Sequence, residues 1–577
     1  MMQRTLIDTL LDWESRAPDR PWLFQPVEGA GRTFTFAQAA DQVRRMAAAI
    51  RAMGLAPGSR IAISGRNTAH WILADLAIAM AGHVAVGLYP RQGQATLGYI
   101  VEHAEIDTIF VGPSLMAGDA DELVASLPKG LRRIGLPYPG TPATELHWDE
   151  LVVAHQPLHD APQVEDGATA MLIYTSGTSG KPKGVMLSHA NLRFAVDNIL
   201  RHTMTPLPRE VLFSYLPLAH LMERLFGEVF GLVIGAEMHF LERPEELAAT
   251  LARVAPTRFS GVPLVYSRIQ GGILGRIPQR KLDRMLRIPL FNTWFKRTLR
   301  RKMGLQNVES LGVGAAAMPA AQVEWFRRLG LDLYQGYGMT ENCAYAALEL
   351  PGASRPGSVG KPLPESGFRI ASDGEIQFRH GAVMAGYFKD EEKTREAFTS
   401  DGWLRTGDRG HLDEDGFLYV TGRIKDEFKT AKGKYVVPAP VENRLARNTD
   451  LEQLCLVGSG LNQPIMLATL SANGKLRPQR DLELQLAADI REVNAEVEAD
   501  ARIAKCVIVD EAWTPDNGLV TPTGKVKRAE VEDHYRELIA YEARTREPVV
   551  CWGRDFVGPV RYGGRADPLV QNLAKLG

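Results

Sequence analysis

Two stretches of the chain alternate helix-like with strand-like hydrophobic patterns, and this alternation constrains the fold more than any other feature. In residues 35–90 the helical pattern FAQAADQVRRMAAAIRAMGL precedes the short strand pattern RIAISG, and the helical HWILADLAIAMAG follows. In residues 211–345 the strand-like patterns lie between helical segments, and they are LFSYLPL, EMHFL, VESLGVG and LDLYQGYG. Strands that alternate with helices form sheets covered by those helices. We therefore predict an α/β protein with two such sheets in a large N-terminal domain.

The pattern of the chain changes from about residue 355. Close-spaced glycine and proline with short alternating runs are typical of antiparallel strands and predict a small β-barrel-like unit. The polar, basic run RIKDEFKTAKGKYV then precedes a compact α+β pattern. We expect an N-terminal domain over residues 1–422, a smaller mobile α+β domain over 423–535 and a C-terminal extension over 536–577 with no assigned role.

The charges and cysteines exclude several classes of protein. Lys and Arg total 67 against 68 for Asp and Glu, so no global field attracts polyanions and we expect no nucleic-acid partner. The four cysteines form no CxxC pair, which argues against a zinc site or a disulfide framework. Asp8, Asp12 and Glu14 interrupt the apolar core of any secretory signal. We therefore expect a cytoplasmic protein.

The most apolar later stretch is Leu225–Leu241. It has only 17 residues and contains Glu228 and Glu237, which makes it short and costly for a membrane-spanning helix. We interpret it as buried structure.

The segment Thr175–Gly184 carries the strongest functional signal. Its glycines let backbone amides approach an anion, its hydroxyls donate hydrogen bonds and its lysines supply charge. It matches neither the P-loop pattern nor G-x-S-x-G. A flexible linker is the alternative, but the lysines lie between an apolar MLIY strand and a VMLSHANL helix start. The candidate phosphate-binding residues are Thr175, Ser176, Gly177, Thr178, Ser179, Gly180, Lys181 and Lys183.

Four later motifs follow this segment in order: YGMTE (337–341), RTGD (405–408), GRIKDEFK (422–429) and PTGKVKR (522–528). Together the five resemble the signature of the adenylate-forming, or AMP-binding, superfamily, which includes acyl-CoA synthetases, adenylation domains of peptide synthetases and firefly-type luciferases. The resemblance covers about residues 10–535. It implies that ATP, Mg²⁺ and coenzyme A are used, the last as co-substrate.

The resemblance also implies roles on the nucleotide side. Glu341, with Thr175, would hold the Mg²⁺, and Thr340 would donate to the α-phosphate. Asp408 would accept hydrogen bonds from both ribose hydroxyls, assisted by Arg423. Without the neighbouring motifs, Asp408 would be taken for a turn residue and Thr340–Glu341 for a helix start or surface pair.

A second set of residues resembles the family's adenine pocket. It comprises Gly314, Ala315, Ala316, Tyr337 and Gly338. The run GVGAAA also approximates the dinucleotide fingerprint G-x-G-x-x-G/A. Asp332 lies about twenty positions later but opens a strand, whereas a ribose contact belongs at a strand's carboxyl end, so the dinucleotide interpretation is disfavoured.

By the same resemblance, Lys525 is the catalytic cation that approaches both the attacking carboxylate and the α-phosphate, and Lys425 is the hinge about which the C-terminal domain rotates between two half-reactions. An ordinary exposed lysine and an ordinary charged linker are the alternatives. His220, in YLPLAHLMER, resembles the gate near the acyl pocket; a core histidine is an equal alternative.

The closest resemblance is to long-chain fatty acyl-CoA synthetases, so a long-chain fatty acid is the preferred carboxylic acid substrate. The rivals are an aryl or medium-chain acyl-CoA ligase, an acyl-AMP ligase that loads a carrier protein, and a non-catalytic lipid-binding protein. Residues 276–302 contain ten Lys or Arg against one acid, Asp283. A solvated helix face is the first interpretation of this run; coenzyme A phosphates or peripheral contact with an anionic inner membrane surface are the others.

Overall fold

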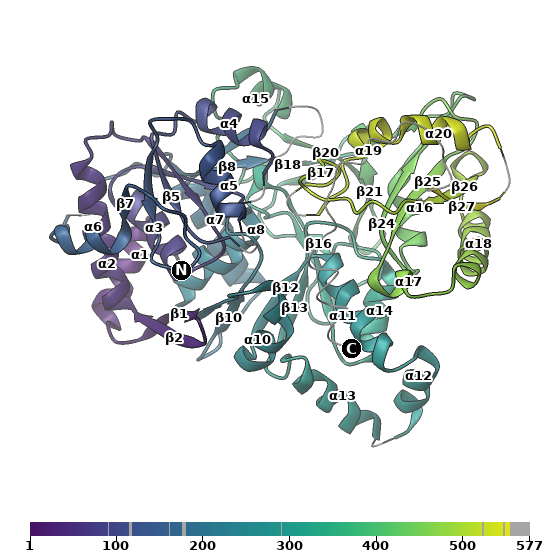
Figure 1. The fold of residues 1–577 in the computed structure, drawn as a ribbon, viewed down its shortest axis with the longest axis horizontal. Helices are drawn as coiled ribbons and strands as arrows, with labels where there is room; N and C mark the ends of the chain where they lie inside the picture. Colours follow the sequence, from purple (N-terminus) through teal and green to yellow (C-terminus); the bar gives the residue numbers. More distant parts are fainter. Residues whose placement is uncertain are drawn as a thin grey trace.

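The computed structural model describes residues 1–553 except 91, 115–117, 161, 176–180, 290, 522–523 and 546–547. Figure 1 shows the N-terminal sheet and its helices on the left, a second sheet with its helices below the centre, and the C-terminal elements on the right. The predicted α/β class is confirmed by sheets and helices that follow the sequence patterns.

The largest sheet has eight strands in the order β19-β9-β8-β4-β3-β5-β6-β7. From β8 to β7 the neighbours are parallel, whereas β9 and β19 join as antiparallel strands. RIAISG forms β3, between helices α2 (Phe36–Ala52) and α3 (Ala69–Met80). The strands are β3 (Arg60–Ser64), β4 (Val84–Leu88), β5 (Thr108–Val111), β6 (Arg132–Gly135), β7 (Leu146–His147), β8 (Thr169–Thr175), β9 (Lys183–Ser188) and β19 (Gly386–Tyr387).

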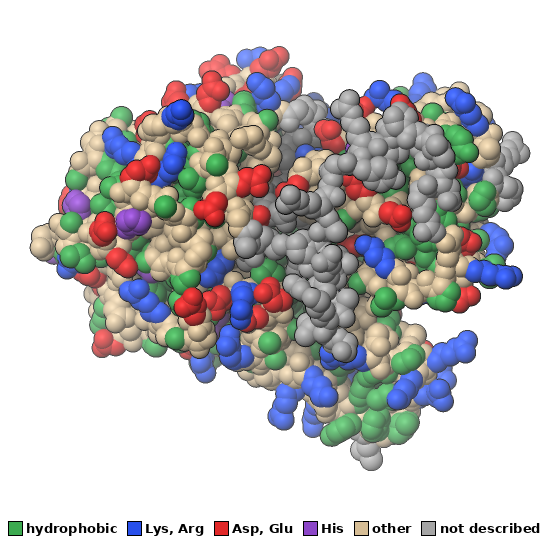
Figure 2. Space-filling view, in the orientation of Figure 1, with side chains coloured by type: hydrophobic (Ala, Val, Ile, Leu, Met, Phe, Trp, Pro, Cys, Tyr) green, Lys and Arg blue, Asp and Glu red, His purple; other side chains and the backbone are tan. Residues whose placement is uncertain are grey.

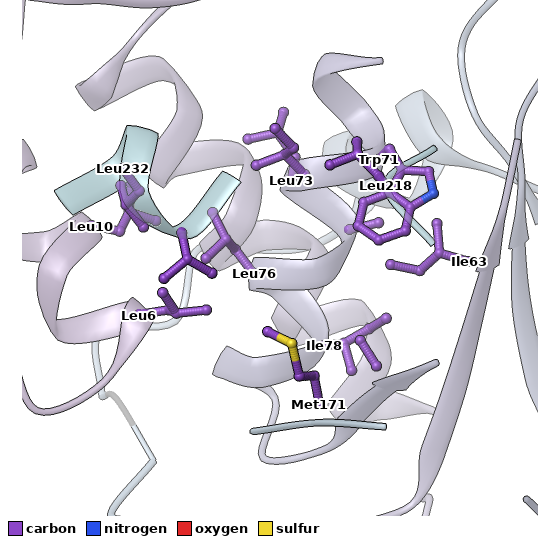
Figure 3. Close-up of a cluster of buried hydrophobic side chains, with 14 of the residues drawn as sticks. Leu6, Leu10, Ile63, Trp71, Leu73, Leu76, Ile78, Met171, Leu218 and Leu232 are labelled. Atoms are coloured by element: carbon purple, nitrogen blue, oxygen red, sulfur yellow. The ribbon is translucent and has the colours of Figure 1, made fainter. Parts of the chain in front are cut away.

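Helix α3 lies at the centre of the main core. Thr68 caps its start, because the threonine side chain accepts from the Trp71 backbone N–H. Nearly every residue of α3 is buried, since other helices cover it on several sides. Figure 3 shows Leu6 and Leu10 of α1 (Leu6–Arg16) grouped with Leu76 of α3. This packing makes a rigid base for the strand ends.

The second region of alternation divides between two sheets. In one, β12, β13 and β14 are parallel and β15 and β16 follow antiparallel. LFSYLPL and EMHFL instead form strands that pair with the N-terminal hairpin, in the order β10-β11-β1-β2. The strands are β12 (Arg258–Gly261), β13 (Ser310–Val313), β14 (Leu333–Tyr337), β15 (Ala347–Leu348), β16 (Lys361–Pro362), β10 (Val211–Ser214), β11 (Glu237–Phe240), β1 (Pro21–Val27) and β2 (Ala30–Thr35).

Helices cover one face of the β12–β16 sheet. Phe259 and Leu311 are buried on that face, in a core shared with these helices. They are α10 (Leu247–Val254), α11 (Pro263–Arg276), α12 (Gln279–Arg287), α13 (Phe291–Lys302) and α14 (Ala320–Arg328).

The apolar stretch Leu225–Leu241 is buried structure, as predicted. It forms most of the π-helix η1 (Arg224–Val229), then α9 (Phe230–Ile234) and strand β11. Glu228 is fully buried beside Arg224, which also pairs with Asp75. No helix among the described residues has the length and apolar character that crossing a bilayer requires.

The small β unit is an antiparallel sheet in the order β17-β18-β20-β21. Within the described chain its edge strands β17 and β21 do not pair, so the expected barrel-like unit is an open sheet. Its strands are β17 (Phe368–Ile370), β18 (Glu375–Phe378), β20 (Leu404–Leu412) and β21 (Leu418–Arg423), and α15 (Glu391–Ala397) lies between β19 and β20 in the chain.

The C-terminal elements enclose two apolar cores of their own, both within residues 428–552. Their sheet runs β24-β25-β26-β27. Helix α20 and strand β27 lie beyond residue 535 and pack into these cores, so both elements share the packing of the C-terminal elements before them. The elements are β22 (Phe428–Lys429), β23 (Tyr435–Val436), α16 (Pro438–Leu445), β24 (Leu451–Val457), β25 (Ile465–Leu470), α17 (Ala472–Lys475), α18 (Gln479–Glu496), β26 (Lys505–Ile508), α19 (Arg528–His534), α20 (Arg536–Glu542) and β27 (Val550–Trp552).

Candidate active site

One cavity of about 2200 Å³ collects most of the predicted site residues. Strands β8, β13, β14 and β20 supply part of its lining, and the C-terminal elements close it from the other side. Parallel strands end at a common sheet edge, which brings loops that are distant in sequence together. The predicted residues in the lining are Thr175, Lys183, His220, Gly314, Ala315, Ala316, Tyr337, Gly338, Thr340, Glu341, Asp408, Arg423, Lys425 and Lys525.

Part of the predicted phosphate loop is not in that lining. Lys181 is exposed, and its Nζ lies 5.0 Å from the centre of the Tyr99 ring. Ser176, Gly177, Thr178, Ser179 and Gly180 lie outside the described residues. The two ends of the loop are described: Thr175 ends β8 directly opposite Lys183, which begins β9.

Asp408 is held by two donors at the junction of β20 and β21. The Tyr337 hydroxyl donates to its Oδ2 at 2.7 Å, and Arg423 Nε lies 3.2 Å from its Oδ1. Strand pairing places Asp408 and Arg423 opposite each other. Burial raises the pKa of the Asp408 carboxyl, and the positive charge of Arg423 opposes that rise. The result is a buried acceptor with fixed orientation.

The chain after β13 and β14 lines the cavity with small residues. A Cβ added at Gly314 would lie 3.4 Å from Met222 Cε, an ordinary contact. A Cβ added at Gly338 would lie only 2.6 Å from Ala344 Cα. The backbone at Gly338 therefore lies so close to the backbone at Ala344 that only glycine fits there. Ala315 has φ +68°, an uncommon conformation for a residue with a Cβ.

Glu341 and Thr340 are mostly buried in the short helix η3 (Thr340–Asn342). The Tyr387 hydroxyl donates a 2.9 Å hydrogen bond to Glu341 Oε1, and Lys183 Nζ lies 4.6 Å from the centre of the Tyr387 ring. Burial lowers the pKa of Lys183, as does Lys425, whereas Glu341 raises it. A carboxylate and a lysine thus face the cavity on either side of one aromatic ring.

The donor set around Glu341 suits a magnesium ion shared with phosphate. Among the described residues no three His, Cys, Asp or Glu side chains gather as a metal site. Mg²⁺ is often bound through one or two carboxylates, with water and substrate phosphate oxygens completing its coordination. Glu341, with the hydroxyl of Thr175 in the same lining, fits that arrangement.

Lys525 enters the cavity from a turn in the C-terminal part. The Thr521 N–H donates to the Lys525 carbonyl at 2.8 Å, and the Lys525 N–H donates to Thr521 Oγ1 at 3.1 Å. The side chain keeps solvent-exposed surface because it projects into a large cavity. The surrounding protein still removes hydration and, with the charge of Arg423, lowers the pKa of Lys525 to about 8; Asp408 and Glu341 oppose this shift.

His220 precedes the short helix α8 (Leu221–Glu223) and caps it. Its Nδ1 accepts from the Met222 N–H at 3.2 Å. Burial, then the charge of Lys525, lowers the pKa of His220 to about 4, so the ring is neutral near pH 7. Because Nδ1 acts as an acceptor, the proton of the neutral ring is assigned to Nε2. Nearby, burial raises the pKa of Glu223 to about 8.

Part of the cavity lining is apolar, and we refer to this part as the apolar branch. Its residues come from α7 (His189–His202), η1, α9, β10 and β11, and Ser260, Gly312 and Gly336 of β12–β14 line the same cavity. Strand β10 lies beside β12, which keeps these two groups of residues together. The apolar lining residues of this branch are Ile199, Met204, Leu212, Phe226, Phe230 and Met238.

Two polar contacts join the C-terminal elements to α11. Arg268 pairs with Glu452 at 3.1 Å, and Asn473 Nδ2 donates to the Gly271 carbonyl at 3.2 Å. Arg268 is more than half exposed, and exposed ion pairs contribute little. The contact is therefore weak enough to be broken.

Sequence reasoning missed Tyr387 and Glu223. Tyr387 is 46 positions from Glu341, and no spacing rule connects two residues that tertiary contacts bring together, here the pairing of β19 with β9 and the hydrogen bond from the Met384 N–H to the Glu341 carbonyl. Glu223 carried a weak signal, since it is an acid at the start of the apolar stretch that follows His220.

Comparisons with known proteins identify the family of this chain. A model of the AMP-binding enzyme family matches residues 10–388, and one of the AMP-binding enzyme C-terminal domain matches residues 425–545. The chain is 30% identical to long-chain-fatty-acid–CoA ligase FadD15 of Mycobacterium bovis, over 91% of this chain and 95% of the relative. It is 28% identical to long-chain-fatty-acid–CoA ligase 1 of Homo sapiens, over 91% of this chain and 83% of that relative.

A solved structure shows a similar fold. The A-PCP didomain of carboxylic acid reductase from Segniliparus rugosus, in complex with AMP, superposes with a TM-score of 0.78 at 19% identity, over 94% of this chain and 82% of that one.

Proposed function

The chain belongs to the family of AMP-binding enzymes, and on that premise we propose that it is an acyl-CoA synthetase. In the first half-reaction a carboxylate oxygen bonds to the α-phosphorus of ATP while the bond to the β,γ-pyrophosphate breaks. In the second, the sulfur of coenzyme A bonds to the acyl carbon, the bond to AMP breaks and the thiol loses its proton. The products are acyl-CoA, AMP and pyrophosphate.

The observation that carries the proposal is the meeting of Lys525, Glu341 and Asp408 in one cavity. A carboxylate that attacks ATP is an anion approaching a polyanion, so the site must supply positive charge where the new bond forms. Lys525 is a mobile point charge from the C-terminal part and supplies it. Mg²⁺ held by Glu341 and the Thr175 hydroxyl would neutralise charge on the phosphate oxygens.

The remaining residues orient the nucleotide. Asp408, held by Tyr337 and Arg423, accepts the ribose hydroxyls, and Gly314, Ala315, Ala316 and Gly338 admit the flat base. Thr340 and Lys183 face the phosphates.

A long-chain fatty acid is the substrate that fits the apolar branch. Its walls carry six apolar side chains, and the relatives named long-chain-fatty-acid–CoA ligases align over most of this chain. The neutral His220 is in the same lining and adds no charge to it. Aryl or medium-chain acids, and a carrier protein in place of coenzyme A, are the rivals.

Alternation between the half-reactions requires the C-terminal domain, residues 423–535 with α20 and β27 packed on them, to turn about Lys425. The weak contact between Arg268 and Glu452 supports such movement. In the present arrangement Lys525 lies in the cavity with Glu341 and Asp408, which suits acyl-AMP formation.

Acids with long apolar chains partition into bilayers. We therefore also propose that the enzyme is cytoplasmic and collects its acid at the inner membrane surface.

The substrate class is tested by measuring AMP release over a panel of short, medium, long-chain and aryl acids, with and without coenzyme A. We expect release to require coenzyme A and to be fastest with long chains. Preference for an aryl acid would favour an aryl acyl-CoA ligase. AMP release that occurs only with an added carrier protein would favour an acyl-AMP ligase that loads such a protein.

A further inference from the structure

The surface made by α12 and α13 stands out from the rest of the molecule in charge. Residues 276–302, which contain both helices, carry ten basic residues, nine of them in α12 and α13, against a single acid, Asp283. The Asp283 carboxylate is already paired with Arg328. Among the described residues, none of the ten has a carboxylate partner within ion-pair distance. The chain as a whole has a net charge of −1, so this basic surface is local.

Helix geometry gathers the charges on exposed faces. Arg280, Arg284 and Arg287 of α12 are exposed at spacings of four and three residues. Residues at these spacings lie on one side of a helix. In α13 the same rule aligns Arg297 and Arg301 with an exposed tryptophan, Trp294.

Large apolar side chains project from the same surface. Trp294 is 60% exposed and Ile288 is 52% exposed. The neighbouring Phe295 is buried in the core beneath, which anchors α13 and leaves Trp294 outside. Figure 2 shows the apolar side chains of the lowest lobe framed by Lys and Arg, where Figure 1 places α12 and α13.

We infer that the α12–α13 surface docks on an anionic lipid bilayer, with Trp294 and Ile288 inserted at the headgroup level and the basic residues around them on lipid phosphates. Exposed apolar side chains surrounded by basic side chains suit the interface of an anionic membrane, where apolar groups insert among the headgroups and basic groups contact lipid phosphates. A nucleic acid would use the charge but would not require inserted apolar side chains. The inference rests on the proposed function, because an enzyme for membrane-partitioned acids gains from contact with their source.

The position of the surface suits delivery of the acid. Helix α13 ends at Lys302, and seven residues later the chain reaches Glu309 and Ser310, which line the cavity. Seven residues span at most about 25 Å. The end of α13 therefore lies within about 25 Å of the cavity lining at Glu309.

The contacts of each basic residue determine which of them can be substituted to test the inference. Arg300 donates to the Leu305 and Val308 carbonyls and secures the end of α13, so it should be kept. The test variant replaces Arg297, Arg301 and Lys302 by Glu, and a second variant is Trp294→Ala. The matched control replaces Lys475, Arg480 and Arg491, exposed basic residues of α17 and α18, by Glu.

The experiment is co-sedimentation of the full chain with vesicles of phosphatidylcholine, with or without a quarter phosphatidylglycerol. The wild type and the control should bind the anionic vesicles. Each basic residue near such a surface is worth about fivefold in affinity, so the triple reversal should weaken binding by about a hundredfold or more. Trp294→Ala should weaken it on the order of tenfold. Pyrophosphate release with a water-soluble short acid should be unchanged in both variants, which shows that they are folded.

Three results would overturn the inference. The first is that the wild type does not bind anionic vesicles, and the second is that the control triple variant loses as much affinity as the test triple variant. The third is that Trp294→Ala binds vesicles as tightly as the wild type does and the protein binds duplex DNA equally tightly. Vesicle binding requires no turnover. A protein that docks but activates no acid would refute the proposed function alone, and one that activates acids without docking would refute the inference alone.

Discussion

The hydroxyl of Tyr387 donates a 2.9 Å hydrogen bond to Oε1 of Glu341, and the ring of the same tyrosine packs 4.6 Å from Lys183 Nζ. Both groups line the cavity, and Tyr387 is itself buried. The tyrosine thus sets the orientation of the proposed magnesium carboxylate and fills the space between it and a phosphate-facing cation.

Replacing Tyr387 by Phe should raise the Mg²⁺ concentration needed for half-maximal acyl-AMP formation. A hydrogen bond to a charged acceptor contributes about 1.5–3 kcal/mol, so the expected loss is roughly tenfold to a hundredfold. Pyrophosphate release measured against Mg²⁺ concentration tests this. Thioester formation from supplied acyl-AMP is the internal control and should persist. An unchanged Mg²⁺ dependence would show that Tyr387 does not position Glu341.

Lys525→Ala should slow acyl-AMP formation by about a hundredfold or more, the scale of losing one charge-stabilising group in the transition state. Transfer from supplied acyl-AMP to coenzyme A should survive, because that step does not need this charge. Rapid-quench assays of the two half-reactions measure this. Equal loss in both would refute the assigned role.

The pH dependence of the first half-reaction should report the same lysine. The pKa of Lys525 is lowered to about 8, so the catalytic cation is present below that pH and is lost as pH rises through it. The value of kcat/KM for ATP, which reports the free enzyme, should therefore fall above about pH 8. In Lys525→Arg, which stays charged, residual activity should lack this fall. A fall at the same pH in the arginine variant would assign it to another group.

Gly338→Ala should damage the site through the backbone. The added Cβ would lie 2.6 Å from Ala344 Cα, so the loop that carries Thr340 and Glu341 must shift. Overpacking of this kind costs about 1–3 kcal/mol. Urea unfolding and pyrophosphate release should both show the damage. Gly272→Ala is the control, because that helical glycine has nothing within 4 Å of its added Cβ, and it should be neutral or stabilising. Equal behaviour of the two variants would contradict the close approach.

Ser260→Leu should shorten the preferred acid. Ser260 lines the apolar branch from β12, and the larger side chain would occupy space used by the distal part of the acyl chain. We expect kcat/KM to fall by tenfold or more for long chains, with little change for short ones and an unchanged KM for ATP. A uniform loss across the panel would place the acyl chain elsewhere.

Much of the site could be predicted because its groups sit in short motifs at strand ends. A local pattern of glycine, hydroxyl and charge predicts that a segment can face an anion, as with Thr175 and Lys183, and the ordered motifs add Glu341, Asp408 and Lys525. All of these line one cavity.

Other features depend on contacts that sequence does not encode locally. β11 pairs with β1, where Leu23 lies opposite Met238 about 215 residues later in the chain, and β10 pairs with β11 and not with β12, although all four strands have similar patterns. Tyr387 reaches Glu341 through a two-residue strand at a sheet edge. Strand β27 could not be predicted from the sequence, because three residues are too few to show the alternating hydrophobic pattern of a strand. Its pairing with β26 is seen only in the structure. Lys181 shares its motif with Lys183 but lies over Tyr99, outside the cavity lining.

The most direct test mixes the purified protein with Mg²⁺, ATP and a long-chain fatty acid in the absence of coenzyme A and detects acyl-AMP by mass spectrometry. The account predicts one acyl-AMP and one pyrophosphate per active site, followed by conversion to acyl-CoA and AMP when coenzyme A is added. If no acid of a broad panel yields pyrophosphate or acyl-AMP, the account is wrong.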